Sequence, residues 1–268
     1  MTTSSSSLSD VTGIIAVITG GGSGLGLFMT RALAANGAKR VYILGRRKNV
    51  LEKAVADIGT QNITPVQCDI TDQDALKSAV SFIEKDAGYI NLLVSNSGIS
   101  GPSLKIEFTN TFHVNCTAVF YTTIAFLALL DAGNKDQTYQ NGRSQVIATS
   151  SIGSFKRKIT AGFAYGVSKE ATTMMMKVLA TYLVPYRIRT NVLCPGLFPT
   201  DLTTNLIHGT DPTVEGSFPL DQIPAERAGT PEDIRGPLLY LVSRAGAYCN
   251  GNCVLTDGGR LSVTPATY

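Results

Sequence analysis

The sequence lacks several features that would point to other classes of protein. Its net charge is only +3 over 268 residues, which is too small to argue for nucleic acid or an acidic membrane surface as a partner. No uninterrupted apolar run reaches the ~18 residues that span a bilayer, because the longest candidate, 118–130, contains Tyr121, Thr122 and Thr123. We therefore expect no nucleic-acid and no membrane partner.

The N-terminus also lacks the pattern of a secretory signal. Residues 1–10 are rich in serine and threonine and contain no basic region followed by an apolar core. We interpret them as a flexible tail and expect a cytoplasmic protein. The five cysteines are odd in number and widely spaced, which argues against a disulfide framework. Cys249 and Cys253 could ligate a metal, but no histidine stands near them, so we expect free thiols and no metal.

Segments typical of strands and helices alternate along the chain. Strands are predicted at 14–19, 41–44, 64–68, 92–95, 145–149, 189–193 and 253–256, and helices at 27–36, 48–58, 73–86, 109–130, 164–184 and 231–241. A polar loop is predicted at 131–144. Such alternation indicates a parallel sheet with helices on both faces. We predict an α/β protein with one doubly wound Rossmann-type domain, 11–268, and about seven strands.

A glycine-rich turn joins the first predicted strand to the first predicted helix. Strand, glycine turn and helix in this order form the setting of a dinucleotide site, although the spacing is Gly-x-x-x-Gly-x-Gly rather than Gly-x-Gly-x-x-Gly. The glycines let the backbone approach a pyrophosphate, and the N–H groups of the helix start face its charge. A flexible hinge is the alternative. The turn predicts cofactor contacts from Gly20, Gly22, Ser23, Gly24, Leu25 and Gly26.

Tyr165 and Lys169 stand four residues apart in a predicted helix, so their side chains share one face. An ammonium near a phenol favours the phenolate and lowers the pKa of the tyrosine from about 10 toward neutrality. At ~4 Å and an effective dielectric constant of about 20, this attraction is worth ~4 kcal/mol. The pair therefore predicts a general acid or base that works near neutral pH.

Together these motifs resemble the short-chain dehydrogenase/reductase family over nearly the whole chain. The resemblance implies a catalytic set of Asn115, Ser151, Tyr165 and Lys169, with Ser150 left open as an alternative to Ser151 because the glycine usual after that serine is displaced. The family's Asn-Asn-Ala-Gly also appears here as Ser-Asn-Ser-Gly at 95–98. The resemblance further implies cofactor contacts from Asp69, Ile70, Asn96, Gly98, Tyr165, Lys169, Pro195, Gly196 and Thr200.

The end of the second predicted strand indicates which cofactor is used. A ribose-binding acid would mark NAD about 20 residues past the glycine turn, but the chain has Gly45 there, followed by Arg46, Arg47 and Lys48. The planar guanidinium group of arginine can donate two parallel N–H hydrogen bonds to a phosphate group. Hydrogen bonds to charged groups contribute ~1.5–3 kcal/mol each, which favours NADP over NAD about ten- to hundredfold. We predict NADPH/NADP as cofactor, bound through Arg46 and Arg47, over the alternative of a solvated charge cluster.

The resemblance implies that Tyr165 protonates a ketone oxygen as hydride is delivered, that Ser151 steadies this oxygen, and that Asn115 anchors a water beside Lys169. The alternatives are an alcohol dehydrogenase, a redox-neutral isomerase or epimerase, or an idle NADPH-binding protein. A homodimer or homotetramer is also implied. Residues 197–230 are predicted to cover a substrate site. Its predicted walls are Ile152, Phe155, Phe163, Leu197, Phe198 and Leu206, with Phe218 beside them. The basic run at 156–158 is interpreted as a solvated loop rather than a site for an acidic substrate.

Overall fold

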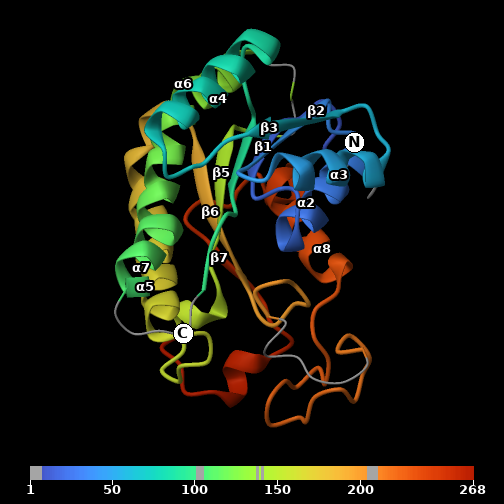
Figure 1. Cartoon of the computed structure of the whole chain (residues 1–268), viewed down its shortest axis with the longest axis vertical. Coiled ribbons are helices and arrows are strands. Elements are labelled where there is room, and N and C mark those ends of the chain that lie inside the picture. The colour runs from blue at the N-terminus through green and yellow to red at the C-terminus, as the bar shows by residue number, and fades with distance from the viewer. Residues whose placement is uncertain (1–7, 101–105, 137–138, 140–141, 204–210) are drawn as a thin grey trace.

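A computed structural model describes residues 8–100, 106–136, 139, 142–203 and 211–268. In these residues, seven strands form one fully parallel sheet in the order β3-β2-β1-β4-β5-β6-β7 (Figure 1). The predicted doubly wound Rossmann-type fold is thus confirmed. The strands are β1 (Ile15–Thr19), β2 (Arg40–Gly45), β3 (Ile63–Gln67), β4 (Leu92–Ser95), β5 (Gln145–Thr149), β6 (Arg189–Pro195) and β7 (Cys253–Thr256).

Helices cover both faces of the sheet because the buried strand residues alternate between two apolar layers (Figure 1). Ala16 and Ile18 of β1 point into the first layer, and Ile15 and Val17 point into the second. The first layer includes residues of α2 (Gly24–Ala35), α3 (Lys48–Ile58) and α8 (Pro231–Val242), and the second includes residues of α4 (Gln73–Ala87), α6 (Ala118–Asp136) and α7 (Phe163–Tyr182).

The helix predicted at 109–130 is divided in the structure. It consists of α5 (Ile106–Phe112), one wider π-type turn, η1 (His113–Thr117), and then α6. Such turns insert an extra residue into a helix and occur frequently at functional sites. The Thr172 hydroxyl of α7 donates a hydrogen bond of 2.7 Å to the carbonyl oxygen of Asn115 in this turn, so the irregular turn is tied to the neighbouring helix.

The polar loop predicted to begin at Asp131 is wrong over its first residues, because α6 continues to Asp136. Gly133 allows this helix to approach the backbone that precedes β4: a Cβ at this position would lie 2.1 Å from the Ile90 carbonyl oxygen. The Asn134 side chain also makes three hydrogen bonds, to the carbonyl oxygens of Tyr186 and Arg187 and from the backbone N–H of Ser144. Residues that are typical of loops therefore serve as tertiary contacts here.

The continuous helical stretch Phe108–Asp136 is, among the described residues, the one helix long and apolar enough by length and composition to cross a membrane. Helices that pack inside a globular core pass the same test. Here Val119, Phe126 and Leu130 point into the second apolar layer, so part of the apolar character belongs to the core.

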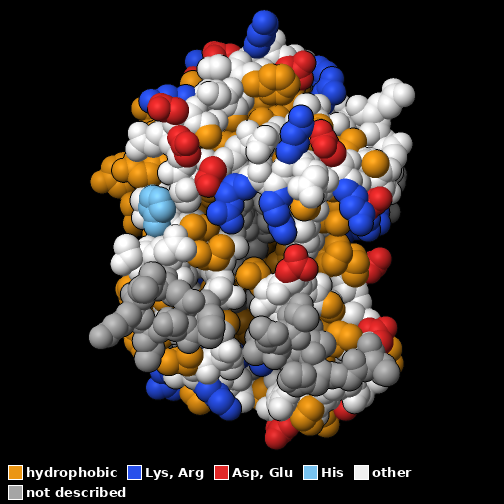
Figure 2. Space-filling view, in the orientation of Figure 1, with side chains coloured by type: hydrophobic (Ala, Val, Ile, Leu, Met, Phe, Trp, Pro, Cys, Tyr) orange, Lys and Arg blue, Asp and Glu red, His pale blue; other side chains and the backbone are white. Residues whose placement is uncertain are grey.

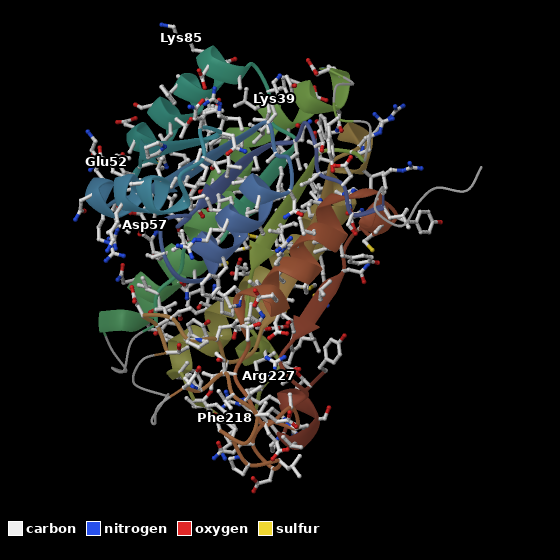
Figure 3. All side chains as sticks on the ribbon, turned by 90° about the vertical axis from the view of Figure 1, so that its right-hand side faces the viewer. Lys39, Glu52, Asp57, Lys85, Phe218 and Arg227 are labelled. Carbon is white, nitrogen blue, oxygen red and sulfur yellow. The ribbon has the colours of Figure 1, made fainter. Side chains whose placement is uncertain are left out.

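The long connection between β6 and α8 lies at the carboxyl ends of the strands and is fastened to the start of α8. Arg227 forms an ion pair with Asp233, with 2.6 Å between Nη1 and Oδ2. Asp233 also accepts hydrogen bonds from the backbone and the hydroxyl of Thr230 and so caps the helix. Phe218 and Arg227 both lie in the lower part of the molecule in Figure 3, where Phe218 packs against the small cluster of Leu197, Ile223 and Ala228.

Candidate active site

A cavity of about 590 Å³ lies at the carboxyl ends of the parallel strands. The order of the strands reverses between β1 and β4, and ligands of such sheets bind outside this switch point. Figure 2 shows a hollow near the centre of the displayed face, with Lys and Arg side chains along its upper rim. The cavity is lined by every predicted cofactor residue except Gly26.

The glycine turn has the close backbone contacts that a dinucleotide cradle needs. Gly20 has a φ of +67°, a left-handed conformation that favours glycine. A Cβ on Gly26 would lie 2.1 Å from the Gly20 carbonyl oxygen and 2.6 Å from Asn96 Nδ2. Gly26 therefore allows the turn to close beneath the cavity rather than lining it.

The turn is held by the end of β4. The Thr19 hydroxyl accepts hydrogen bonds of 3.0 Å from the backbone N–H groups of Asn96 and Ser97, and the Asn96 amide donates to the Thr19 carbonyl. Ser23 precedes α2 without forming a side-chain cap, and the first turn of the helix has no acidic residue. The N–H groups of this turn therefore suit a phosphate, which fits the pyrophosphate of a dinucleotide.

Arg46 and Arg47 are exposed and line the far end of this cavity together with Asp69. Burial raises the pKa of Asp69, but two hydrogen bonds from Thr71 and the charge of Arg46 outweigh this effect and hold the pKa below its usual range. Gly45 lies beside Leu51, since a Cβ on the glycine would be 3.3 Å from Leu51 Cδ2. This end of the cavity thus presents two guanidinium groups and one carboxylate.

The four predicted catalytic residues come from three elements that meet at the cavity. Ser151 follows β5, Tyr165 and Lys169 lie on α7, and Asn115 lies in η1. The Ser151 hydroxyl accepts a hydrogen bond of 3.0 Å from the Gly153 backbone N–H. A Cβ on Gly153 would lie 3.3 Å from this hydroxyl oxygen and 3.5 Å from Tyr165 Cε1. These contacts place Ser151 beside the tyrosine.

Ser150 faces away from the tyrosine. Its hydroxyl donates to the Lys169 carbonyl oxygen at 2.9 Å and lies 2.7 Å from Thr173 Oγ1. Its hydrogen bonds therefore fasten β5 to the backbone of α7. Of the two serines left open by the sequence, the geometry favours Ser151 as the one that reaches a reacting group.

Lys169 is buried and its ammonium donates a 2.8 Å hydrogen bond to the Thr149 carbonyl oxygen. Burial lowers its pKa to about 8. Asn115 is fully buried; its side chain binds both backbone groups of Ile99 and donates to Ser168 Oγ at 3.0 Å. A Cβ on Gly98 would lie 3.2 Å from both Asn115 Oδ1 and Lys169 Nζ, so these two polar groups flank the same glycine.

The expected effect of Lys169 on Tyr165 is corrected by the structure. Burial raises the pKa of the Tyr165 phenol, and the nearby Ser151 hydroxyl only partly opposes this effect. Lys169 Nζ lies 5.8 Å from the centre of the tyrosine ring. The attraction of ~4 kcal/mol is the value before the cost of removing the groups from water is subtracted, and in the structure that cost is the larger effect.

Comparisons with known proteins agree with this arrangement. The sequence profile described as short chain dehydrogenase matches residues 14–211. The chain belongs to the short-chain dehydrogenase/reductase family. It is 45% identical to the short-chain dehydrogenase/reductase VdtF of Byssochlamys spectabilis, over 98% of this chain and 97% of that protein. It is 43% identical to PhomF of Diaporthe leptostromiformis, over 97% and 96%.

Among solved structures, the Pseudomonas aeruginosa RhlG/NADP active-site complex aligns with a TM-score of 0.84 and 25% identity, covering 94% of this chain and 98% of that chain. A gluconate 5-dehydrogenase from Burkholderia cenocepacia, in complex with NADP and tartrate, aligns with a TM-score of 0.81 and 25% identity, covering 96% and 98%. The short-chain dehydrogenase/reductase family comprises oxidoreductases that use NAD(P) and act on small molecules.

In this short-chain dehydrogenase/reductase, a second cavity of about 390 Å³ adjoins the first. Three of the predicted substrate residues line it: Ile152, Phe163 and Leu197. Phe198 instead lines the cofactor cavity, where its buried ring packs so closely on Gly229 that a Cβ on the glycine would lie 2.4 Å from it. Leu206 lies outside the described residues.

Two other aromatic residues predicted at the substrate site line neither cavity, so the prediction of Phe155 as a wall is wrong. Phe155 is buried behind the second cavity against Tyr268, and Phe218 packs on the Leu197 cluster. Leu202 and Thr203 of the predicted substrate loop also line the second cavity, whereas Val167, Glu170 and Arg260 of its lining were not predicted from the sequence. Two of these, Val167 and Glu170, follow Tyr165 on α7 and could have been found from helical spacing, whereas Arg260 has no local signal.

Proposed function

We propose that this protein reduces a ketone to a secondary alcohol, with NADPH as the hydride donor. The observation that carries the proposal is that Ser151 and Tyr165 line both cavities. A carbonyl group bound in the smaller cavity can therefore meet the tyrosine, the serine and a nicotinamide in the larger one. Both cavities lie within the size range of small-molecule sites.

When bound, the nicotinamide supplies a hydride to the carbonyl carbon, and negative charge then develops on the carbonyl oxygen. Tyr165 donates its phenolic proton to this oxygen, and the Ser151 hydroxyl donates a hydrogen bond to it. The raised pKa of Tyr165 keeps the phenol protonated and ready to donate. Lys169 stabilises the phenolate that is left behind, and Asn115 anchors a water beside Lys169 that returns the proton.

The preference for NADPH is proposed from Arg46 and Arg47, which line the cavity where a ribose phosphate would lie. Their guanidinium groups suit a phosphate, and the neighbouring position that would carry a repelling carboxylate is Gly45. We expect NADPH to be favoured over NADH about ten- to hundredfold.

The first test is an absorbance assay with NADPH and NADH over a panel of ketones. The Tyr165→Phe variant should lose turnover while it still binds NADPH. Tyr182→Phe is the matched control, since Tyr182 lies on the same helix with 72% of its surface exposed and should retain activity. Turnover that survives Tyr165→Phe would refute the proposed role of the tyrosine.

The cofactor preference is tested separately. Arg46→Ala should raise the KM for NADPH about tenfold and leave that for NADH nearly unchanged, because one charge-assisted contact is lost. Lys53→Ala removes an exposed charge from α3 outside the cavity and serves as the control. A preference for NADH in the unaltered protein would overturn the assignment of NADPH but not the chemistry.

Alcohol oxidation and redox-neutral isomerisation or epimerisation are the competing activities on this scaffold. The gluconate 5-dehydrogenase of Gluconobacter oxydans, named for an oxidation, is 29% identical to this chain. Consumption of one NADPH per product separates net reduction from isomerisation. NADPH binding without any turnover over the panel would support the idle-binder alternative.

We also propose that the protein forms a homodimer or homotetramer in the cytoplasm. Exposed apolar side chains support association: they lie on α6 and α7 and include Phe120, Tyr121, Ile124, Val178 and Tyr182. Light scattering at micromolar concentration tests the assembly, and a monomer would refute it. Fractionation of the source cells tests the compartment.

A further inference from the structure

A cationic wall lines the smaller cavity. It consists of Lys156, Arg157 and Lys158, which follow the short helix η2 (Ile152–Ser154), and Arg260, which begins η6 (Arg260–Val263). The basic run 156–158 was interpreted from the sequence as a solvated loop. Arg157 and Lys158 are indeed exposed, but Lys156 and Arg260 are partly buried, so two of the four charges are partly removed from water.

The two segments that carry this wall are joined by an antiparallel contact. Lys156 pairs with Ala266 in a β-bridge. The Arg157 backbone N–H donates to the Pro265 carbonyl at 2.9 Å, and the Thr267 N–H donates to the Phe155 carbonyl at 2.8 Å. The cationic wall is therefore a built feature of the fold, held by backbone hydrogen bonds on both sides of Lys156.

The partly buried charges of this wall lack direct partners. Within the described part of the chain, neither Lys156 Nζ nor the Arg260 guanidinium makes a hydrogen bond or an ion pair. Burial lowers the pKa of Lys156 to about 8, and repulsion from Arg260 and Lys158 adds to this effect.

Two carboxylates lie near the wall. The charge of Asp257 partly opposes the lowering of the pKa of both Lys156 and Arg260 by burial. Its oxygens, however, are bound by the backbone N–H groups of Gly259 and Leu261 at 3.0 and 2.8 Å, and it is not part of the cavity lining. Glu170 also lines the cavity, and the cation that acts on its charge is Lys177 of the same helix. Four cationic side chains therefore face one carboxylate along the lining, and the cavity carries excess positive charge.

We infer that the substrate is an apolar ketone that carries an oxyanion, which Lys156 and Arg260 bind while its carbonyl group meets Tyr165. This inference rests on the proposed function, since it assigns the substrate class of the same site. Ile152, Val167 and Leu197 line the same cavity and suit the apolar body of such a molecule. A carboxylate is the simplest such group, because guanidinium and ammonium donors bind it by charge-assisted hydrogen bonds.

The experiment compares ketones that differ in charge at one end. The three compounds are para-acetylbenzoate, para-acetylbenzamide and para-acetylphenyl phosphate. Their KM values are measured with NADPH, and their dissociation constants are measured by calorimetry on the NADP-saturated protein. The calorimetric arm reports binding whether or not the compound is reduced. We expect para-acetylbenzoate to bind ten- to hundredfold more tightly than the amide.

Two variants locate the effect on the cationic wall. Lys156→Gln and Arg260→Gln should each reduce the affinity for para-acetylbenzoate about tenfold and leave that for the amide nearly unchanged. Lys53→Gln removes an exposed charge on α3, outside the smaller cavity, and should leave both affinities unchanged. An equal loss in the Lys53 variant would show a general effect of charge and overturn the inference.

The outcomes separate this inference from the proposed function. If the protein bound all three compounds with equal affinity and reduced them normally, the proposed oxyanion site would be overturned and the proposed reductase activity would not. Tight binding of the benzoate that depends on Lys156, without NADPH oxidation by any ketone, would support the oxyanion site and overturn the reductase. A preference for the phosphate would support the oxyanion site and assign it to a phosphate ester.

Discussion

Replacement of Gly133 by alanine tests the close approach between α6 and the backbone that precedes β4. The added Cβ would lie 2.1 Å from the Ile90 carbonyl oxygen and 2.9 Å from Ser144 Oγ, so the helix must move by about an ångström to restore van der Waals contact. Overpacking of this kind costs up to about 3 kcal/mol. Alanine regains about 1 kcal/mol of helix propensity over glycine. The net loss in unfolding free energy should be about 2 kcal/mol.

The assay is thermal unfolding followed by far-ultraviolet circular dichroism, together with urea denaturation. A loss of about 2 kcal/mol should lower the Tm by roughly 4–8 °C in a protein of this size. Lys135→Ala is the matched control, because Lys135 lies in the same last turn with its side chain exposed and should change the unfolding free energy by less than about 0.5 kcal/mol. A Gly133→Ala protein as stable as the unaltered one would refute the contact and the extension of α6.

Three further predictions concern the glycine turn and two ionisable groups. Asp233→Asn should lower the unfolding free energy by about 1 kcal/mol at neutral pH, and Glu232→Gln beside it should change little. The pKa of Asp233 is lowered from 3.8 to about 2 by Arg227 and by the hydrogen bonds from Thr230. This contribution to the unfolding free energy is therefore present above pH ~4 and is lost as the pH falls toward 2. Urea denaturation at several pH values measures this loss. Lys169 has a pKa lowered from 10.5 to about 8, so the unfolded chain binds more protons than the folded chain between these pH values. The unfolding free energy of the cofactor-free protein should therefore rise by about 3 kcal/mol relative to that of Lys169→Met as the pH rises through this window. A flat difference would contradict the burial of the charge. Gly26→Ala should weaken NADPH binding more than tenfold in fluorescence titrations, because its Cβ would strike the Gly20 carbonyl oxygen, and unchanged affinity would exclude the turn as the cradle.

Much of the fold could be predicted because strands and helices carry local signals. The β1, β4 and β7 segments are apolar or β-branched runs bounded by turn residues, and their predicted limits agree with the structure to within one residue. The glycine turn is recognisable for the same reason, since its neighbours in sequence are also its neighbours in space. The family assignment followed from motifs of this local kind.

The remaining features depend on contacts between distant parts of the chain. Helical periodicity does not reveal the extra residue of the π-type turn around Asn115. Composition alone favoured a loop at Gly133 and Asn134, but tertiary contacts stabilise a helix at these two residues. The pKa of Tyr165 depends on how deeply the phenol is buried, which the spacing of Tyr165 and Lys169 does not give. Arg260 and Lys156 line the smaller cavity together although 104 residues separate them in the sequence, so no local pattern brings the two together.

The long separation between bonded partners also sets an order of assembly during synthesis. The Thr19 hydroxyl can accept its hydrogen bond from the Asn96 N–H only after 77 more residues have been synthesised. The Phe155 carbonyl can accept its hydrogen bond from Thr267 only after 112 more residues. Non-local pairings of this kind form late, because loop closure must precede them. The glycine turn thus lacks its hydrogen bonds to Asn96 and Ser97 until β4 has docked. The wall of the smaller cavity is incomplete until residues 264–267 have been synthesised. A nascent chain halted between these points would have its glycine turn fastened to the end of β4 while the wall of the smaller cavity was still incomplete.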